Sequence, residues 1–141
     1  MTSTSPSKET TVPEEADPSR DRALLCVKAA IDKKAENAKV LNLTDLSGFT
    51  DYFVICSGTS DRQVQAISDS VESTMKKAGW PSLSVEGHNE GRWVLMDFGD
   101  VVVHIFLDAL REYYDLENLW SDAPQVKIPS DYYWPAASRM N

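Results

Sequence analysis

The sequence contains no apolar run that approaches the eighteen or so residues of a membrane-spanning helix. The start of the chain lacks the apolar core of a secretory signal. Residues 1–18 carry four acidic residues and one lysine, which disfavours an organellar transit peptide. We therefore expect a cytoplasmic protein without a membrane span, in which residues 1–18 form a disordered acidic N-terminal tail.

Cysteine is scarce in this chain. Cys26 and Cys56 lie thirty positions apart in apolar periodic stretches, without a CxxC motif or nearby clustered histidines. This pattern predicts two buried, reduced thiols rather than a disulfide or a metal site. A chain of 141 residues is long enough to bury a sizeable core without either.

Signatures of the common enzyme classes are also missing. The DFG at 97–99 resembles a kinase motif, but the chain has no glycine-rich loop and no HRD motif to accompany it. It has no G-x-S-x-G for a serine nucleophile. His88, His104, Asp97 and Asp100 lack a metal-ligand spacing such as H-x-x-x-H. We predict no catalytic residue, no metal and no cofactor.

One enzyme class stays open as an alternative. The sequence SGTSD at 57–61 falls at a predicted strand-to-helix junction, where helix N-terminal amides could hold a phosphate for nucleotidyl transfer. Two metal-binding carboxylates on one strand face need a spacing of two residues, whereas Asp97 and Asp100 are three apart across a turn. The catalytic carboxylates of such an enzyme are therefore missing.

The charge balance favours one kind of partner. The net charge is −8, of which residues 1–18 supply −3 and residues 121–141 supply zero, so the remainder carries −5. An acidic surface binds phosphate backbones poorly, because each contact must neutralise charge. We expect a basic protein partner and no direct sequence-specific contact with nucleic acid.

Hydrophobic periodicity and turn signals predict a single α/β domain over residues 19–121, with one mixed β-sheet and packed helices. Ser60 and Gln63 form an S-x-x-Q capping box at the start of one helix. Residues 122–141 are predicted to form an extended C-terminal tail. The expected elements, in order, are a helix at 19–37, strands at 39–43 and 52–57, a helix from Ser60 to Gly79, strands at 83–86, 92–98 and 101–106, and a helix at 107–116 that runs on into LENLW.

A two-residue turn at Gly99 and Asp100 would fix the register of the last two strands, because facing residues then have numbers that sum to 199. Alternation sorts their side chains into two faces. One face is wholly apolar and is predicted to face the core: Val94, Met96, Phe98, Val101, Val103 and Ile105. The other mixes aromatic and polar side chains and is predicted to bind a partner: Trp93, Leu95, Asp97, Val102, His104 and Phe106.

Structural alternatives exist for this second face. His104 could be a satisfied, half-buried strand histidine. Trp93 and Phe106 are predicted to pair, and could be covered by the helix at 107–116 or by the C-terminal tail. Asp97 and His104 are diagonal neighbours, close enough for a side-chain or water-mediated contact.

Three segments resemble the Iojap-like ribosomal silencing factors: DYFVICSGTSDRQVQAISDSV, VEGHNEGRWVLMDFGDVVVHIF and REYYDLENLW. The resemblance spans about residues 20–122. It implies a degenerate, non-catalytic nucleotidyltransferase-like fold and a cytosolic factor that binds large-subunit ribosomal protein fourteen. Such a factor blocks joining of the small subunit and represses translation under nutrient limitation. The family also implies homodimers, and organellar relatives that assist large-subunit assembly, which is an alternative function here.

The resemblance also carries over a set of binding residues. Trp93 is the expected anchor, with Tyr113, Tyr114 and Trp120 beside it, and Asp97 and His104 as polar contacts. The full predicted set is Trp93, Asp97, His104, Phe106, Arg111, Tyr113, Tyr114, Leu116, Leu119 and Trp120.

Overall fold

The computed structural model describes residues 17–133. The predicted N-terminal tail therefore lies almost wholly outside the described residues, as does the end of the C-terminal tail. None of the helices in the described part of the chain is long and apolar enough to cross a bilayer.

Five strands form one mixed sheet in the order β1-β2-β5-β4-β3, which confirms the predicted fold class. β2 and β5 are parallel, and the other neighbouring pairs are antiparallel. β2 is buried along its whole length, as its continuous apolar run predicts. The strands are β1 (Glu36–Asn42), β2 (Tyr52–Gly58), β3 (Ser84–Glu86), β4 (Trp93–Asp97) and β5 (Val101–Leu107).

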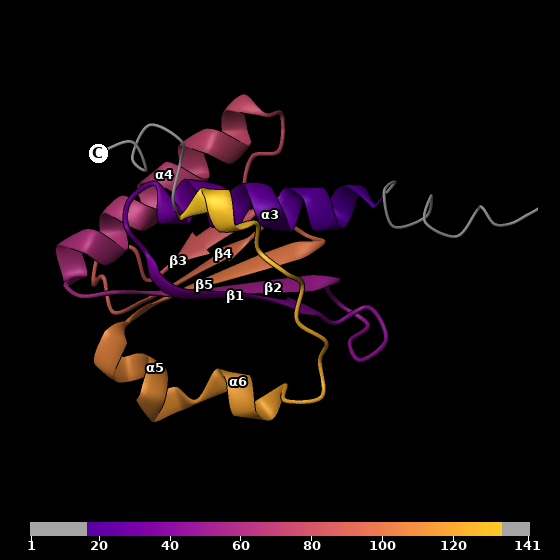
Figure 1. Ribbon diagram of the computed structural model, residues 1–141. Helices are drawn as coiled ribbons and strands as arrows, with labels where there is room; N and C mark the ends of the chain where they lie inside the picture. The colour runs from indigo at the N-terminus through magenta and orange to yellow at the C-terminus, as the bar shows by residue number, and fades with distance from the viewer. Residues whose placement is uncertain (1–16, 134–141) are drawn as a thin grey trace, which may run out of the picture.

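Helices cover both faces of this sheet (Figure 1). The long helices α3 (Pro18–Ile31) and α4 (Asp61–Lys77) lie on one face, and the short helices α5 (Asp108–Tyr114) and α6 (Leu116–Leu119) lie on the other. We call these the α3–α4 face and the α5–α6 face.

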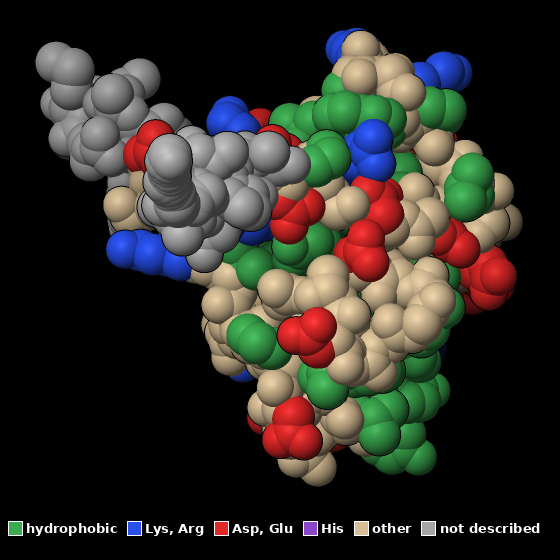
Figure 2. Space-filling model, turned by 90° about the vertical axis from the view of Figure 1, so that its right-hand side faces the viewer, with side chains coloured by type: hydrophobic (Ala, Val, Ile, Leu, Met, Phe, Trp, Pro, Cys, Tyr) green, Lys and Arg blue, Asp and Glu red, His purple; other side chains and the backbone are tan. Residues whose placement is uncertain are grey.

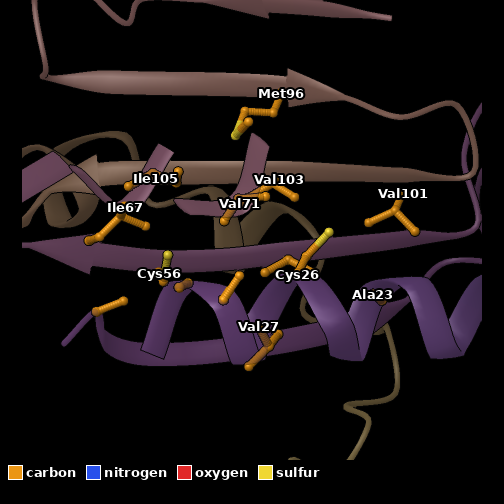
Figure 3. Packing of buried hydrophobic residues seen from close by; sticks show 14 of the residues in the cluster. Ala23, Cys26, Val27, Cys56, Ile67, Val71, Met96, Val101, Val103 and Ile105 are labelled. Atoms are coloured by element: carbon orange, nitrogen blue, oxygen red, sulfur yellow. The ribbon is translucent and has the colours of Figure 1, made fainter. Parts of the chain in front are cut away.

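The α3–α4 face buries a mainly aliphatic core (Figure 3). Cys26 on α3 and Cys56 on β2 are both buried and free of a disulfide, as the sequence predicts. The apolar face predicted for the hairpin contributes Val94, Met96, Val101, Val103 and Ile105 to the same cluster, with Phe98 at its margin. This face supplies most of the hydrophobic stabilisation of the domain.

Both long helices begin at a side-chain cap, and the cap of α4 is the predicted Ser60. The Asp17 carboxylate accepts a hydrogen bond from the Arg20 amide, and Pro18 occupies the first turn. Ser60 Oγ accepts from the Gln63 amide, but Gln63 Oε1 accepts from the amide of Thr59 rather than that of Ser60. The second hydrogen bond of the capping box, accepted by the Gln63 side chain, is therefore shifted by one residue, from Ser60 to Thr59.

The first helix is shorter than predicted. It ends at Ile31, not at residue 37, and β1 already begins at Glu36. Lys34 takes the left-handed conformation at φ 65°, and the Ala35 amide bonds back to the Ala30 carbonyl. This is a Schellman-type helix end with lysine at the position where glycine is usual. Because glycine is the usual sequence signal, this helix end could not be predicted from the sequence.

The β4–β5 hairpin has the predicted register. Trp93 faces Phe106, Leu95 faces His104 and Asp97 faces Val102. The Phe98 amide donates to the Val101 carbonyl at 2.9 Å. The DFG sequence is therefore the end of one strand and part of a turn.

The helix expected at 107–116 is divided. α5 ends at Tyr114, Asp115 is left-handed at φ 50°, and α6 begins at Leu116. Aspartate adopts this conformation more readily than most residues, because its short polar side chain can bond locally. The break turns the chain so that α6 runs back across the sheet.

Residues 122–133, which we call the C-terminal strap, lie along the outer edge of β1. The Asn42 amide donates to the Pro124 carbonyl, and the Val126 amide donates to the Val40 carbonyl, each at 2.8 Å. Ala123 belongs to the cluster on the α5–α6 face, while Ile128 packs against the cluster on the opposite face. The strap thus passes from one face of the sheet to the other (Figure 1).

Candidate binding surface

The second face of the hairpin is not open to solvent. Its side chains join a second apolar cluster that α5 and α6 cover: Leu41, Leu43, Phe53, Ile55, Val102, Phe106 and Ala123, with Trp93, Leu95, Leu110, Leu116 and Trp120 partly buried around them. The strand face that was predicted to bind a partner therefore lies beneath α5 and α6. The surface available to a partner lies on α5 and α6.

Trp93 is the centre of an aromatic group. Its ring stacks on Phe106 with centroids 4.8 Å apart, which confirms the predicted pair, and lies 4.8 Å from the ring of Tyr114. The indole Nε1 donates to His104 Nδ1 at 3.2 Å. Of the two covers considered for this pair, the helix after β5 is the one that supplies it, through Tyr114.

His104 is buried, with 4% of its surface exposed, and burial lowers its pKa to about 4. Because Nδ1 accepts from Trp93, the neutral ring carries its proton on Nε2. Among the described residues Nε2 has no hydrogen-bond partner. In this conformation neither His104 nor the fully buried Phe106 can touch a partner directly.

Asp97 and His104 make no direct hydrogen bond with each other among the described residues, and each side chain has a different partner. Asp97 Oδ1 accepts from the Gly99 amide at 2.8 Å and closes the hairpin turn. Asp100 accepts from Ser19 and from Arg22, which ties the turn to α3. Within residues 17–133, no three carboxylate, histidine or cysteine side chains are grouped to hold a metal.

Arg111 holds α5 and α6 to the sheet. Its Nε and Nη2 donate to the two carboxylate oxygens of Glu117 at 3.0 and 2.9 Å, and its Nη1 donates to Ser57 Oγ at 2.9 Å. Lys39 on β1 lies 3.1 Å from the same Glu117 carboxylate. Only 8% of the Arg111 side chain is exposed. Arg111 therefore positions α5 and α6 from the side that faces the sheet.

Glu117 was not among the predicted site residues. The hydrogen bonds from Arg111, assisted by Lys39, lower its pKa to about 2 despite partial burial. Six positions separate Arg111 from Glu117, which is not a helical contact spacing. The left-handed turn at Asp115 brings them together, so no sequence periodicity could have paired them.

The outward side of α5 and α6 is apolar. Tyr113 is 78% exposed and Leu119 is 75% exposed, and half of Tyr114 is accessible. Leu116 and Trp120 are half-buried at the margin. Figure 2 shows apolar side chains gathered at the lower edge of the molecule, with acidic side chains spread over the lower half. We call Tyr113, Tyr114 and Leu119 the α5–α6 surface.

The SGTSD loop has no free anion site in this conformation. The amide and hydroxyl of Thr59 both donate to Gln63 Oε1, at 2.7 and 2.9 Å. A Cβ added at Gly58 would stand 3.0 Å from Val64, so this glycine serves close packing. A phosphate would have to displace the Gln63 side chain.

The sequence matches the family described as "Ribosomal silencing factor during starvation" over residues 16–140. The chain belongs to this family. It is 46% identical to the ribosomal silencing factor of Bacillus subtilis over 76% of this chain and 92% of that protein. These findings confirm the predicted family, and the matched range includes the C-terminal strap.

Two further similarities extend the comparison. A crystal structure of a Chromobacterium violaceum protein superimposes with a TM-score of 0.71 at 36% identity, covering 82% of this chain and 97% of that one. The mouse protein named "Mitochondrial assembly of ribosomal large subunit protein 1" is 36% identical over 62% of this chain and 41% of its own length. The silencing-factor fold is thus common to this chain and a solved bacterial structure.

Proposed function

We propose that this protein binds the large ribosomal subunit through large-subunit ribosomal protein fourteen and sterically blocks joining of the small subunit. By this action it represses translation under nutrient limitation. The family description supports a role in ribosomal silencing during starvation. The name of the mouse relative supports the large subunit as the place of action.

The α5–α6 surface is the observation that carries the proposal. Large exposed apolar and aromatic side chains are the residues that dominate protein interfaces. Segment 108–122 surrounds them with five acidic residues, and its one basic residue, Arg111, is buried in an ion pair. This combination suits a basic protein with an apolar contact patch, as expected of a ribosomal protein.

The predicted site residues take different roles in this proposal. Tyr113, Tyr114 and Leu119 make the direct contacts, with Leu116 and Trp120 at the rim. Trp93 supports Tyr114 from behind, and His104 and Phe106 support Trp93. Arg111 positions the layer, and Asp97 shapes the hairpin. The protein acts in the cytoplasm as a binding factor without catalysis or cofactor, and it binds neither membrane nor specific nucleic-acid sequence.

Binding and joining can be measured with one set of variants. We expect the wild type to sediment with purified large subunits in sucrose gradients and to reduce their association with small subunits as magnesium is raised. Tyr113→Ala combined with Leu119→Ala should weaken binding about tenfold or more, because interface anchors of this kind each contribute on the order of 1 kcal/mol or more.

Leu83→Ala is the matched control, because Leu83 is 72% exposed but lies beside the β4–β5 turn, away from α5 and α6. It should bind like the wild type. Unchanged binding by the double variant, or equal loss in both variants, would reject the α5–α6 surface as the contact. Sedimentation velocity of the free protein tests the family-implied homodimer separately.

A role in large-subunit assembly is a second candidate, favoured by the name of the mouse relative. It uses the same contact at an earlier time, so binding data do not separate the two. Precursor large subunits should accumulate after depletion if assembly is the main role, whereas silencing predicts normal subunits and unrestrained joining. The nucleotidyltransferase alternative predicts micromolar nucleotide binding with magnesium in a calorimetric titration, and the Gln63 contacts argue for none.

A further inference from the structure

The β1–β2 loop, residues 43–51, carries two exposed apolar side chains. Phe49 is 66% exposed, and Leu46 is 45% exposed. Nine residues is long for a connection between antiparallel neighbours, which usually takes about two to five. The proposed function does not use this loop.

The loop is an ordered turn. The amides of Leu46 and Ser47 both donate to the Leu43 carbonyl at 2.9 Å, and the Phe49 amide donates to Ser47 Oγ. Leu43 and Thr50 are buried at its two ends. Fixed ends and internal bonds hold the two apolar side chains outward, so little conformational entropy would be lost on binding.

Ring contacts connect the loop to α6. The Phe49 ring centroid lies 6.3 Å from that of Phe53, and Phe53 lies 5.7 Å from Trp120 at the end of α6. Trp120 in turn borders Leu119 of the α5–α6 surface. Phe53 itself is buried, so it links the loop from beneath to Trp120 at the margin of the α5–α6 surface.

The loop and the segment that carries the α5–α6 surface are both rich in acidic residues. Segments 43–51 and 108–122 contain seven acidic residues, and their one basic residue, Arg111, is buried and paired with Glu117: the acids are Asp45, Asp51, Asp108, Glu112, Asp115, Glu117 and Asp122. Figure 2, which looks at the side from which the loop projects, shows acidic side chains across this region. A symmetric contact with a second copy would place acid against acid.

We propose that the β1–β2 loop is the second contact element of the ribosome-binding surface, with Phe49 seated in an apolar recess of the same basic ribosomal protein that the α5–α6 surface contacts. The inference rests on the proposed function and adds a residue and an element to it. The acidic rim steers the basic partner, and Phe49 and Tyr113 anchor its two ends.

The experiment compares three variants for binding to purified large subunits: Phe49→Ala, the conservative Phe49→Leu, and the control Leu83→Ala. We expect Phe49→Ala to weaken binding about tenfold, Phe49→Leu to restore most of it, and Leu83→Ala to bind like the wild type. Denaturant unfolding should confirm that all three variants are folded.

The outcomes separate this inference from the proposed function. If the wild type does not bind large subunits, the proposed function fails. If the wild type binds and the Tyr113 and Leu119 double variant is weakened, but Phe49→Ala is not, the loop proposal alone is overturned. If Phe49→Ala instead shifts the free protein between monomer and dimer while leaving ribosome binding unchanged, the occupant of the loop is a second copy, which also overturns the proposal.

Discussion

The two faces of the sheet are covered in different ways. On one face, helices of 14 and 17 residues bury aliphatic side chains and both cysteines. On the other, helices of seven and four residues cover an aromatic group with a buried histidine, held by a buried arginine. The α3–α4 face is built for stability. The α5–α6 face leaves several large apolar side chains exposed, and these are the side chains that we propose to bind the ribosome.

A cavity in the α3–α4 face should give the largest loss of stability. Ile67 on α4 is fully buried, and Ile67→Ala should lower the free energy of unfolding by about 2–5 kcal/mol through lost burial and the cavity left behind. Urea unfolding followed by tryptophan fluorescence measures this. Ribosome binding of the folded variant should stay unchanged, and a large binding loss would mean that the two faces are not independent.

Acid should act mainly on the α5–α6 face, through His104. Its pKa falls from 6.5 to about 4 on folding, so the unfolded chain binds the proton more tightly. Stability contributed by neutral His104 is complete above pH 6.5 and is lost as the pH falls from 6.5 through 4, by about 3 kcal/mol. His104→Gln should flatten this part of the pH profile of unfolding. An identical slope in that variant would assign the effect elsewhere.

Removal of the arginine under α5 and α6 should have a smaller effect on stability. Arg111→Ala leaves Ser57 unpaired and Glu117 with only Lys39, at a cost of about 2 kcal/mol. Hydrogen exchange should accelerate at the amides of α5 and α6 and not at those of α4. If hydrogen exchange accelerated equally at all amides, Arg111 would stabilise the whole domain rather than the α5–α6 face alone.

Local rules predicted the elements whose signals lie close together in the sequence. Ser60 capped its helix, and the turn at Gly99 fixed the hairpin register, because both depend on adjacent residues. The predicted end of α3 was wrong because lysines and alanines favour a helix. The left-handed Lys34 and the buried Ala35 instead reflect tertiary packing.

The candidate site was likewise predicted where its signals are local in sequence and missed where they depend on tertiary packing. Alternation along the hairpin correctly grouped Trp93, His104 and Phe106, but it could not reveal that α5 and α6 fold back over them. That cover depends on one left-handed residue, Asp115, and on an ion pair between residues with no periodic spacing. Burial in the second layer was therefore beyond the reach of pattern reasoning.

The order of the strands has a consequence for synthesis. β5, the central strand, is the last of the five along the chain, and it alone joins the β1–β2 pair to the β3–β4 pair. Until β5 leaves the ribosome, the nascent chain consists of two unconnected hairpins with open inner edges. Because α5 and α6 follow β5, the surface that we propose silences ribosomes is assembled only after most of the chain has left the ribosome that made it.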